Sequence, residues 1–523
     1  MNLYQWQRKA SEKLKNKNGI LSAPTGAGKT IVAYSWAGLI DNSGIIKKPE
    51  QRIIFTAPIK ALSNERYLEL KKMGIDVGIE TGDFKQNNHA PVLCCTQEIY
   101  TNKYANIENQ LIIIDEFHYI SSDPGRARAY IDGIINTHPT SKTLVMSATF
   151  GKPEEVKDYL ERIRGKDFEL FQTNERVTEL VLEKKPVDIT ELHNALVFVF
   201  SRRGVDAIAA EIMENRELLP TAKLQRLEEL ANIFTVEPEL LPYVFNYGIG
   251  TYYGSMLPKL KLLVETAFRE GILDLVVGTD ALALGVNLPA ETVVFAQLAK
   301  YYDGPINTNQ FYQMAGRAGR KGFYEKGYVS YYASEHESFE YDTNELYAEL
   351  LTSDLKPMSI RIDISIRNLI KETTSIKKEA EYVAQNSLPV LDANELEEQI
   401  TFVMKNINFY INDVANDDEQ MSSRLKKLLA EIYYPEFSVS SNIELAILFT
   451  ANEIVSLLDI VYIICQDTKN DFYALLQAKK YLNSLSMRRL RKKVKDMSSI
   501  DNMINEIDPT IMGFEEILKA VGR

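Results

Sequence analysis

The chain has 523 residues, 45% of them hydrophobic and 25% charged, which excludes the disordered, collagen-like and coiled-coil classes; at roughly 100–200 residues per domain, it predicts about three domains. The formal net charge of −12 argues against an extended nucleic-acid-binding surface, although a local basic groove would suffice for binding. Because three cysteines cannot form a disulfide framework and the first residues contain no apolar signal segment, we expect a soluble, reduced, cytoplasmic protein without a membrane span.

Short, almost continuously hydrophobic runs recur along the first two thirds of the chain. They cover residues 20–23, 53–57, 111–114, 143–147, 196–200, 273–277 and 292–295. Segments with a helical pattern lie between them, for example 29–40 and 203–215. Hydrophobic runs without alternation are typical of strands covered by helices on both faces. The pattern therefore predicts parallel sheets whose ligands bind at the carboxyl ends of the strands.

The strands form two groups, which predict two sheet domains. The first group ends near Ser147, a charged stretch follows at 151–166, and the second group runs from about residue 168 to 333. From residue 335 the pattern is helical. A window at 360–366, where isoleucines alternate strictly, fits either a strand or a helix.

The segment APTGAGKT, residues 23–30, follows a predicted strand and opens a predicted helix. Gly26 and Gly28 allow the backbone to curl, so that its N–H groups face phosphate oxygens. Lys29 supplies a positive charge for the β- and γ-phosphates, and the Thr30 hydroxyl is a ligand for Mg²⁺. This segment predicts binding of a nucleoside triphosphate.

The segment DEFH begins at Asp115, directly after a predicted strand. Asp115 is placed to hold Mg²⁺ through its hydration shell, and Glu116 to orient or deprotonate an attacking water. An acidic pair after a strand is often only a solvated turn, but together with a phosphate loop it predicts hydrolysis. His118 is either a functional residue or a hydrogen-bonded core histidine.

The segment QMAGRAGR, residues 313–320, places Arg317 and Arg320 on one helical face. Two arginines at this spacing are often solvated, but fixed guanidinium groups are also what a transferring γ-phosphoryl group requires. Because this segment lies in the second sheet domain, its arginines would have to reach the nucleotide across an interdomain cleft.

In this order the three segments and SAT, residues 147–149, resemble the motifs of superfamily-two helicases, and most closely those of the superkiller-type DExH RNA helicases. The resemblance covers about residues 3–333. It implies that the nucleotide-binding residues are Gln7, Thr25, Gly26, Gly28, Lys29, Thr30 and Asp280. It implies that the catalytic residues are Lys29, Asp115, Glu116, Gln313, Arg317 and Arg320, and that the coupling residues are His118, Ser147 and Thr149.

Further segments resemble the motifs with which this family holds a nucleic-acid backbone. The resemblance assigns that role to Pro58, Lys60, Thr81, Gly82 and Thr96 in the first domain, and to Ser201, Arg202 and Thr279 in the second. The chain departs from the family at Tyr252 and Tyr253, where paired histidines are usual. Residues 361–369 resemble the family's winged-helix segment, which favours a helix in the ambiguous window.

We therefore expect an α/β fold with two tandem RecA-like domains, residues 1–166 and 167–334, followed by an all-helical domain, residues 335–523. The expected function is unwinding and translocation along single-stranded RNA or DNA, driven by ATP and Mg²⁺, with RNA slightly preferred. Movement from 3′ to 5′ is implied by the resemblance alone.

Three alternatives stay open. The chain could be a DNA helicase, or a non-unwinding ATPase that clamps nucleic acid as a subunit of a nuclease or defence complex. A GTPase or small-molecule kinase is disfavoured, because neither Asn16-Lys17 nor Asn102-Lys103 is followed by the aspartate that guanine recognition requires.

One basic segment lies outside these motifs. Residues 479–495 contain eight basic residues and no acidic residue. On a helix one face would carry Arg488, Arg491, Lys492 and Lys495, with apolar residues opposite. This basic face is either solvated or a contact for a nucleic-acid backbone.

If the basic face contacts phosphates, replacing its four residues with glutamine should flatten the dependence of strand binding on salt. The slope of log K against log [salt] is expected to fall by up to about 0.7 per lost contact on single strands. Fluorescence anisotropy at several salt concentrations measures this slope. If the glutamine variant keeps the wild-type slope and unwinds normally, the basic face does not contact phosphates and is either solvated or a docking surface for a protein.

Overall fold

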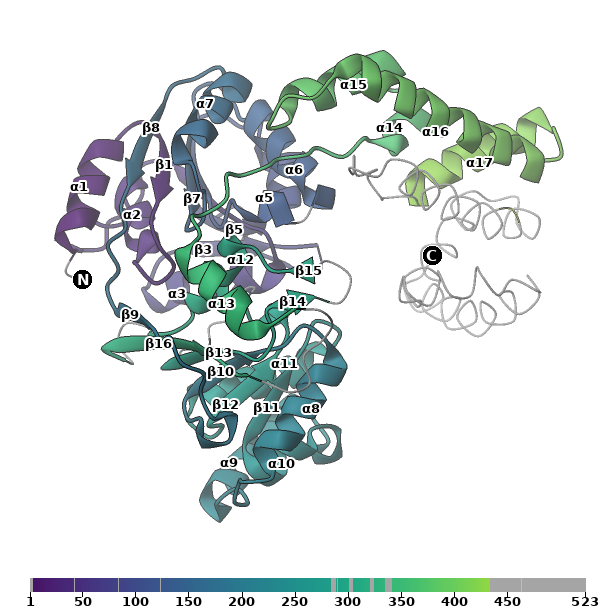
Figure 1. Cartoon of the computed structure of the whole chain (residues 1–523). Helices are drawn as coiled ribbons and strands as arrows, with labels where there is room; N and C mark the ends of the chain where they lie inside the picture. The colour runs from purple at the N-terminus through teal and green to yellow at the C-terminus, as the bar shows by residue number, and fades with distance from the viewer. Residues whose placement is uncertain are drawn as a thin grey trace, which may run out of the picture. The chain divides into compact units, whose positions relative to one another are not determined.

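The computed structural model describes residues 3–41, 43–82, 84–122, 124–283, 288, 290–300, 304–319, 324–333, 341–432 and 462 (Figure 1). The chain divides into two compact units, Met1–Tyr119 with Asp132–Met358 and Ile120–Ile131 with Ser359–Arg523. Arg320 and the predicted basic face, residues 488–495, lie outside the described residues. Within the described residues, no helix is long and apolar enough to cross a membrane.

The first unit contains an eight-stranded sheet in the order β4-β3-β5-β2-β6-β7-β1-β8. Its strands are β1 Asn18–Ser22, β2 Arg52–Ala57, β3 Val77–Glu80, β4 Lys85–Gln86, β5 Val92–Thr96, β6 Gln110–Ile114, β7 Lys142–Ser147 and β8 Phe168–Gln172. Every pairing is parallel except that of β3 with β4. The carboxyl ends of β1, β2, β5, β6 and β7 therefore meet at one edge, as the hydrophobic runs predict.

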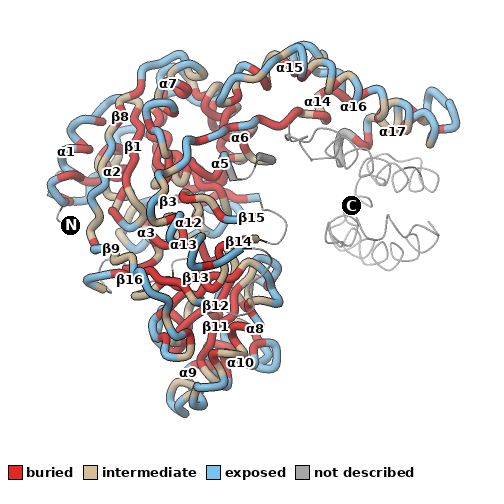
Figure 2. Tube along the Cα trace, in the orientation of Figure 1, coloured by how far each residue is buried: buried red, intermediate tan, exposed pale blue. Residues whose placement is uncertain are grey.

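Helices flank this sheet and bury its apolar strands (Figure 2). They are α1 Gln5–Leu14, α2 Lys29–Trp36, α3 Lys60–Lys72, α4 Gln97–Ile99 and α7 Pro153–Arg164, with a π-helical turn η1 at Tyr100–Tyr104. Two further helices, α5 Tyr119–Ser122 and α6 Pro124–Asn136, span the division between the units. The core of this sheet includes Trp6, Val32, Phe55 and Ile113.

The first domain is expected to end at residue 166, but it contains one more strand, β8. β8 pairs with β1 along its whole length, from Asn18 opposite Phe168 to Ser22 opposite Gln172. The first sheet therefore ends at Gln172. A short alternating strand at the edge of a sheet resembles a strand of the next domain until its partner is known.

The second sheet has six parallel strands in the order β11-β12-β10-β13-β16-β9. They are β9 Glu179–Leu182, β10 Ala195–Phe198, β11 Ile249–Tyr252, β12 Leu275–Gly278, β13 Thr292–Phe295 and β16 Lys326–Tyr331. A small antiparallel pair is formed by β14 Ala299–Lys300 and β15 Gly304–Pro305. The helices are α8 Arg202–Met213, α9 Thr221–Phe234, α10 Pro242–Tyr247, α11 Pro258–Arg269, α12 Thr308–Ala315 and α13 Thr343–Thr352, with 3₁₀ turns η2 Ile189–Glu191, η3 Pro238–Leu240 and η4 Asp280–Leu282.

An aromatic cluster joins α12 and α13 to the second sheet. The Phe311 ring lies 4.9 Å from that of Phe295 and 5.8 Å from that of Tyr347, measured between centroids. The Tyr347 hydroxyl donates to the Val329 carbonyl at 3.0 Å. The second domain therefore includes α13, and its unit continues to Met358. The expected start of a separate helical domain at residue 335 is wrong, because the apolar face of α13 completes this core.

The second unit is helical where it is described, as expected. It contains α14 Ile366–Ile370, α15 Ile376–Asn386, α16 Ala393–Val414 and α17 Glu419–Ile432. Arg128, from residues 120–131, forms a buried ion pair with Glu379 and donates to the Asp363 carbonyl at 3.1 Å. In the ambiguous window, Ile360 forms only an isolated bridge with Leu388 and α14 begins at Ile366, so residues 361–365 form neither the expected strand nor the expected helix.

Removing the central ring of the aromatic cluster should destabilise the second sheet domain. Phe311 is fully buried, so Phe311→Ala is expected to cost about 3–5 kcal/mol through lost burial and the cavity left behind. Denaturant unfolding followed by intrinsic fluorescence measures the loss. Phe84 is 52% exposed, so Phe84→Ala is the control and should stay within about 0.5 kcal/mol of wild type. Equal effects of the two changes would contradict this account of the core.

Candidate functional site

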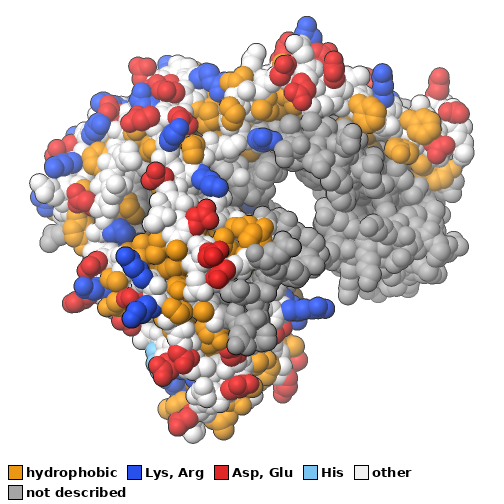
Figure 3. All heavy atoms as spheres, in the orientation of Figure 1, with side chains coloured by type: hydrophobic (Ala, Val, Ile, Leu, Met, Phe, Trp, Pro, Cys, Tyr) orange, Lys and Arg blue, Asp and Glu red, His pale blue; other side chains and the backbone are white. Residues whose placement is uncertain are grey.

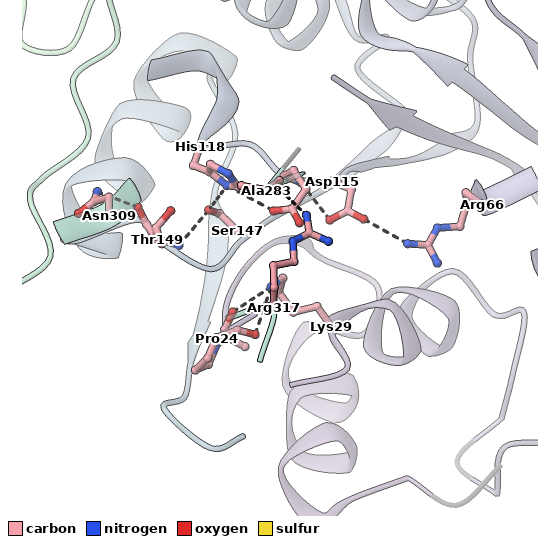
Figure 4. Close-up of polar contacts among 12 residues, drawn as sticks. Pro24, Lys29, Arg66, Asp115, His118, Ser147, Thr149, Ala283, Asn309 and Arg317 are labelled. Atoms are coloured by element: carbon pink, nitrogen blue, oxygen red, sulfur yellow. Dashed lines mark hydrogen bonds and ion pairs between the residues drawn. The ribbon is translucent and has the colours of Figure 1, made fainter. Parts of the chain in front are cut away.

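The phosphate loop follows β1 and closes as its glycines predict. Gly26 and Gly28 have φ of 79° and 88°, in the left-handed region that favours glycine. The Ala27 N–H donates to the Pro24 carbonyl at 3.2 Å, and α2 begins at Lys29. The Lys29 ammonium is buried and donates to the carbonyls of Ala23 and Pro24 at 3.1 and 3.3 Å (Figure 4). It can exchange these carbonyls for phosphate oxygens when a nucleotide binds.

Gln7, one of the expected nucleotide-binding residues, lies against this loop. Its Oε1 accepts from the Tyr4 N–H at 2.9 Å, and its Nε2 donates to the Gly28 carbonyl at 3.2 Å. A Cβ atom on Gly28 would lie 2.7 Å from Nε2, so a side chain there would displace the Gln7 amide, and the backbone angle of Gly28 itself favours glycine. The buried amide is thereby held in one orientation beside the phosphate loop.

The acidic segment forms a strained turn at the end of β6. Glu116 has a φ of 50°, which costs a non-glycine residue roughly 1–3 kcal/mol and is typical of functional sites. Two contacts hold the turn. The Glu116 N–H donates to Asp115 Oδ1 at 2.9 Å, and the N–H of fully buried Phe117 donates to the Met146 carbonyl of β7 at 2.9 Å.

The two carboxyl groups of this turn differ in their electrostatic surroundings. Burial and the charge of Glu116 raise the pKa of Asp115, against the opposing effect of Arg66. Burial also disfavours ionisation of Glu116, but His118 in its protonated form, together with the charges of Lys29 and Arg317, holds the pKa of Glu116 below the ordinary value. Glu116 is therefore ionised at neutral pH, as an acceptor of a proton from water must be.

The three expected coupling residues form one hydrogen-bonded group. His118 Nδ1 lies 3.0 Å from Ser147 Oγ and 3.3 Å from Glu116 Oε2, and Ser147 Oγ accepts from the Thr149 N–H at 3.2 Å. Burial lowers the pKa of His118, so its ring is neutral at pH 7. Glu116 is thus connected through His118 and Ser147 to the loop after β7.

This group continues into the second domain through Asn309, which sequence reasoning missed. Its side-chain amide donates to the carbonyl of Thr149 at 3.3 Å and to that of Lys356 at 2.9 Å, and accepts from the Lys356 N–H at 2.7 Å (Figure 4). A lone asparagine four residues before Gln313 gives no sequence signal of this role, because its partners are distant in the chain.

The arginine motif of the second domain packs on the phosphate loop. A Cβ atom on Gly316 would lie 2.5 Å from Thr25 Cβ, so the turn after α12 touches the loop directly. Next to it, Arg317 donates to the Ala283 carbonyl. The positive charge of Arg317 lowers the pKa of Glu116, which places this second-domain residue within electrostatic reach of the acidic turn.

Two expected site residues are not brought to the phosphate loop by any described contact. Gln313 lies half-buried on α12 and has no hydrogen-bond partner among the described residues. Asp280, expected to bind the nucleotide, is paired instead with the Lys300 ammonium at 2.8 Å.

The residues expected to hold nucleic acid lie where strands of the two sheets end. In the first sheet these are Pro58 and Lys60 after β2, Thr81 and Gly82 after β3, and Thr96 at the end of β5. In the second, Ser201 and Thr279 follow β10 and β12 and cap the next helical turns with their hydroxyl groups. The Arg202 guanidinium lies over the ring of Tyr253, 5.0 Å from its centroid. Tyr253, at the departure from the family's histidines, therefore supports a predicted nucleic-acid contact.

A further residue that the sequence did not indicate, Arg66 of α3, contacts both expected Mg²⁺ ligands. Its Nη2 lies 3.1 Å from Thr30 Oγ1 and 3.3 Å from Asp115 Oδ2. Its Nη1 donates to Tyr34 and to Glu69. Figure 4 shows the Arg66 side chain approaching Asp115 from the side away from Lys29 and Arg317. A hydroxyl and a carboxylate that converge on one cation are a suitable oxygen pair for Mg²⁺. Thr30 and Asp115 therefore fit this ion, and Arg66 positions them.

Comparison with protein families agrees with this architecture. Residues 4–158 match the DEAD/DEAH box helicase model, and residues 172–322 match the helicase conserved C-terminal domain. The chain therefore belongs to the superfamily-two helicases, and its relatives include the DExH RNA helicases that the motifs resemble.

Two curated relatives and one solved structure indicate the range of similarity. The ATP-dependent RNA helicase mtr4 of Schizosaccharomyces pombe is 28% identical over 397 residues, which cover 59% of this chain and 35% of that protein. The probable helicase HelY of Mycobacterium tuberculosis is 26% identical over 420 residues, which cover 62% and 45%. This chain thus spans less than half of either relative. The DUF1998 helicase MrfA bound to DNA shares the fold, with a TM-score of 0.51 and 20% identity over 73% of this chain and 52% of that one.

Neutralising Arg66 should raise the Mg²⁺ requirement for nucleotide binding. Hydrogen bonds to charged groups contribute roughly 1.5–3 kcal/mol, so Arg66→Gln is expected to increase the half-saturating Mg²⁺ concentration about tenfold or more. Titration of a fluorescent ATP analogue at several Mg²⁺ concentrations measures this requirement. Arg66→Lys should recover part of the loss, and Lys72→Gln, exposed on the same helix, should have no effect. If Arg66→Gln needs no more Mg²⁺ than wild type, Arg66 does not position the Mg²⁺ ligands.

Proposed function

We propose that this chain is an ATP-dependent nucleic-acid helicase that hydrolyses ATP between its two RecA-like sheets and moves along a single strand. The observation that carries the proposal is the direct packing of Gly316 in the arginine motif on Thr25 in the phosphate loop. A phosphate loop alone supports nucleotide binding. A second domain that brings Arg317 to the same loop supports a site that is complete only when the two domains meet.

The residues at this loop can divide the work of hydrolysis. Lys29 binds the β- and γ-phosphates after leaving the loop carbonyls, and Glu116 orients and deprotonates the attacking water. Thr30 and Asp115 would hold Mg²⁺, whose chemical contribution is to neutralise charge on the β- and γ-phosphate oxygens. Arg317 stabilises the charge of the transferring γ-phosphoryl group from the second domain.

Hydrolysis can reach the strand-holding residues through the coupling group. Glu116 contacts His118, His118 contacts Ser147, and Asn309 connects the loop after β7 to α12. Loss of the γ-phosphate would weaken the hold of Arg317 on the first domain. The second domain could then shift its grip on the strand while the first domain keeps its own.

The strand is single-stranded RNA or DNA, and we propose RNA as the preferred polymer with movement from 3′ to 5′. RNA is favoured by the similarity to a relative named as an RNA helicase. On the face drawn in Figure 3, acidic and basic side chains are interspersed, so the net negative charge is not gathered into one acidic surface there. From the sequence we also expect the protein to be cytoplasmic, and it could be a subunit of a nuclease or other complex.

One comparison tests this function against its alternatives. ATP hydrolysis is measured without polymer, with single-stranded RNA and with single-stranded DNA, alongside a strand-displacement assay. Stimulation by RNA with displacement supports the helicase, and stimulation by DNA alone identifies a DNA helicase. Stimulation without displacement identifies a non-unwinding clamp. Hydrolysis that no polymer stimulates would overturn the proposal.

Two substitutions should separate nucleotide binding from chemistry. Lys29→Ala is expected to weaken ATP binding, because the loop loses its phosphate-binding charge. Glu116→Gln should bind ATP and remain on the strand, yet lose at least about 10²-fold in hydrolysis, the scale of a positioned acid–base group. Filter binding and phosphate release measure the two properties, with exposed Glu228→Gln as the control. Normal hydrolysis by Glu116→Gln in the presence of polymer would refute this catalytic site.

Removing the Asn309 amide should uncouple polymer binding from hydrolysis. Asn309→Ala loses three hydrogen bonds, one to Thr149 and two to Lys356, so stimulation of the ATPase by polymer should fall at least about tenfold. ATP binding should be unchanged, because Asn309 does not touch the phosphate loop. Asn406→Ala is the control, because this half-buried asparagine on α16 donates to the Phe402 carbonyl of its own helix. Full stimulation in Asn309→Ala would show that the signal takes another route.

A further inference from the structure

The connection between β8 and β9 passes beside both loops that form the nucleotide site. At its start, the Thr173 N–H donates to the carbonyl of Ser22, the last residue of β1, at 3.0 Å. At its end, the buried Thr178 methyl lies 2.9 Å from where a Cβ atom on Gly319 would be. The chain that crosses from the first sheet to the second is thus fixed beside the phosphate loop and then beside the arginine motif.

Arg176 lies in the middle of this connection and contacts both loops. Its Nη2 lies 3.4 Å from the position that a Cβ atom on Gly26 would take. The same nitrogen donates to the Ala318 carbonyl at 3.1 Å, between Arg317 and Gly319. One guanidinium therefore meets the phosphate loop of the first sheet and the arginine motif of the second.

The charge of Arg176 has no counter-charge in the described part of the chain. There, the Ala318 carbonyl is its only hydrogen-bond acceptor, no carboxylate lies within ion-pair distance, and its buried Nε has no acceptor. Arg66, another arginine at this site, is paired with Glu69 and Asp115. Burial lowers the pKa of Arg176, with no carboxylate to offset it. A partly buried guanidinium without an anion is costly, so the arrangement suits an anion that arrives with a ligand.

We infer that Arg176 binds the β- or γ-phosphate of the nucleotide through its free N–H groups while Nη2 stays bonded to Ala318. The inference rests on the proposed function and adds a basic residue from the interdomain connection to Lys29 and Arg317. Guanidinium groups suit this role because their planar donors bind two oxygens at once. A phosphate held by Arg176 would also hold the connection against both loops and so favour the closed arrangement of the two sheets.

Nucleotide affinities of the full-length protein test this assignment. Dissociation constants are measured for ADP, a non-hydrolysable ATP analogue and AMP, in wild type, Arg176→Gln, Arg176→Lys and the control Arg226→Gln. Arg226 is an exposed arginine paired with Glu229 and Glu270, so its change removes the same charge elsewhere. We expect Arg176→Gln to weaken ADP and the ATP analogue at least about tenfold and AMP hardly at all, because AMP lacks the β- and γ-phosphates. Arg176→Lys keeps the charge without the planar donors and should fall between.

Each other outcome has a distinct meaning. Wild-type affinities in Arg176→Gln would overturn the inference and leave Arg176 as a link between the connection and Ala318. Equal weakening of AMP and ADP would overturn the phosphate assignment in favour of the ribose or base. If Arg176→Gln does not fold, a wild-type affinity in Arg176→Lys would likewise count against a phosphate held by the planar donors. Wild-type protein that binds neither ADP nor the ATP analogue would refute the proposed function itself.

Discussion

The packing of the arginine motif on the phosphate loop is the contact that holds the whole site together. Gly316 meets Thr25 so closely that a single Cβ atom would collide with the threonine side chain. Any other residue at this position would push the two loops apart. Arg317, which follows it, would then lose its reach toward Glu116. Because Gly316 has no side chain, the loops of the two sheets can pack closely enough for Arg317 of the second sheet to act on Glu116 of the first.

Charge balance explains why so many basic residues can be buried at this place. Asp115 and Glu116 are partly buried carboxylates close to Lys29, Arg66 and Arg317, and each sign offsets the cost of burying the other. Arg66 is fully paired and can serve only to position its neighbours. Lys29 is held by carbonyl oxygens, and Arg176 by one carbonyl, so both can turn to a phosphate. The polyphosphate of a nucleotide would supply the missing negative charge.

A continuous set of contacts runs from the acidic turn to the second domain. It begins at Glu116, passes through His118 and Ser147 to Thr149, and reaches α12 at Asn309. Each member is short or rigidly held, so a shift of α12 has few ways to be absorbed before it reaches the turn. The strained φ of Glu116 fits this role, because a strained residue is sensitive to the contacts that hold it.

Local patterns in the amino-acid sequence are enough to predict the features of this protein that depend on neighbours in the chain. Glycines at 26 and 28 demand a curled loop, and unbroken hydrophobic runs demand covered parallel strands. These two requirements place Lys29 at the start of the helix after the loop, and Asp115 and Ser147 at strand ends, where the fold has them. Gln7 is assigned by resemblance, and its amide is held against the phosphate loop.

Features that depend on partners distant in the chain follow only from the folded arrangement. The pairing of β8 with β1 and the packing of α13 on the second sheet move both domain boundaries, because a strand or helix belongs to the domain that buries its apolar face. Arg66, Arg176 and Asn309 carry no local pattern that separates them from ordinary surface residues. Their roles come from atoms brought within hydrogen-bond distance by the fold, and that distance is not encoded by spacing along the chain.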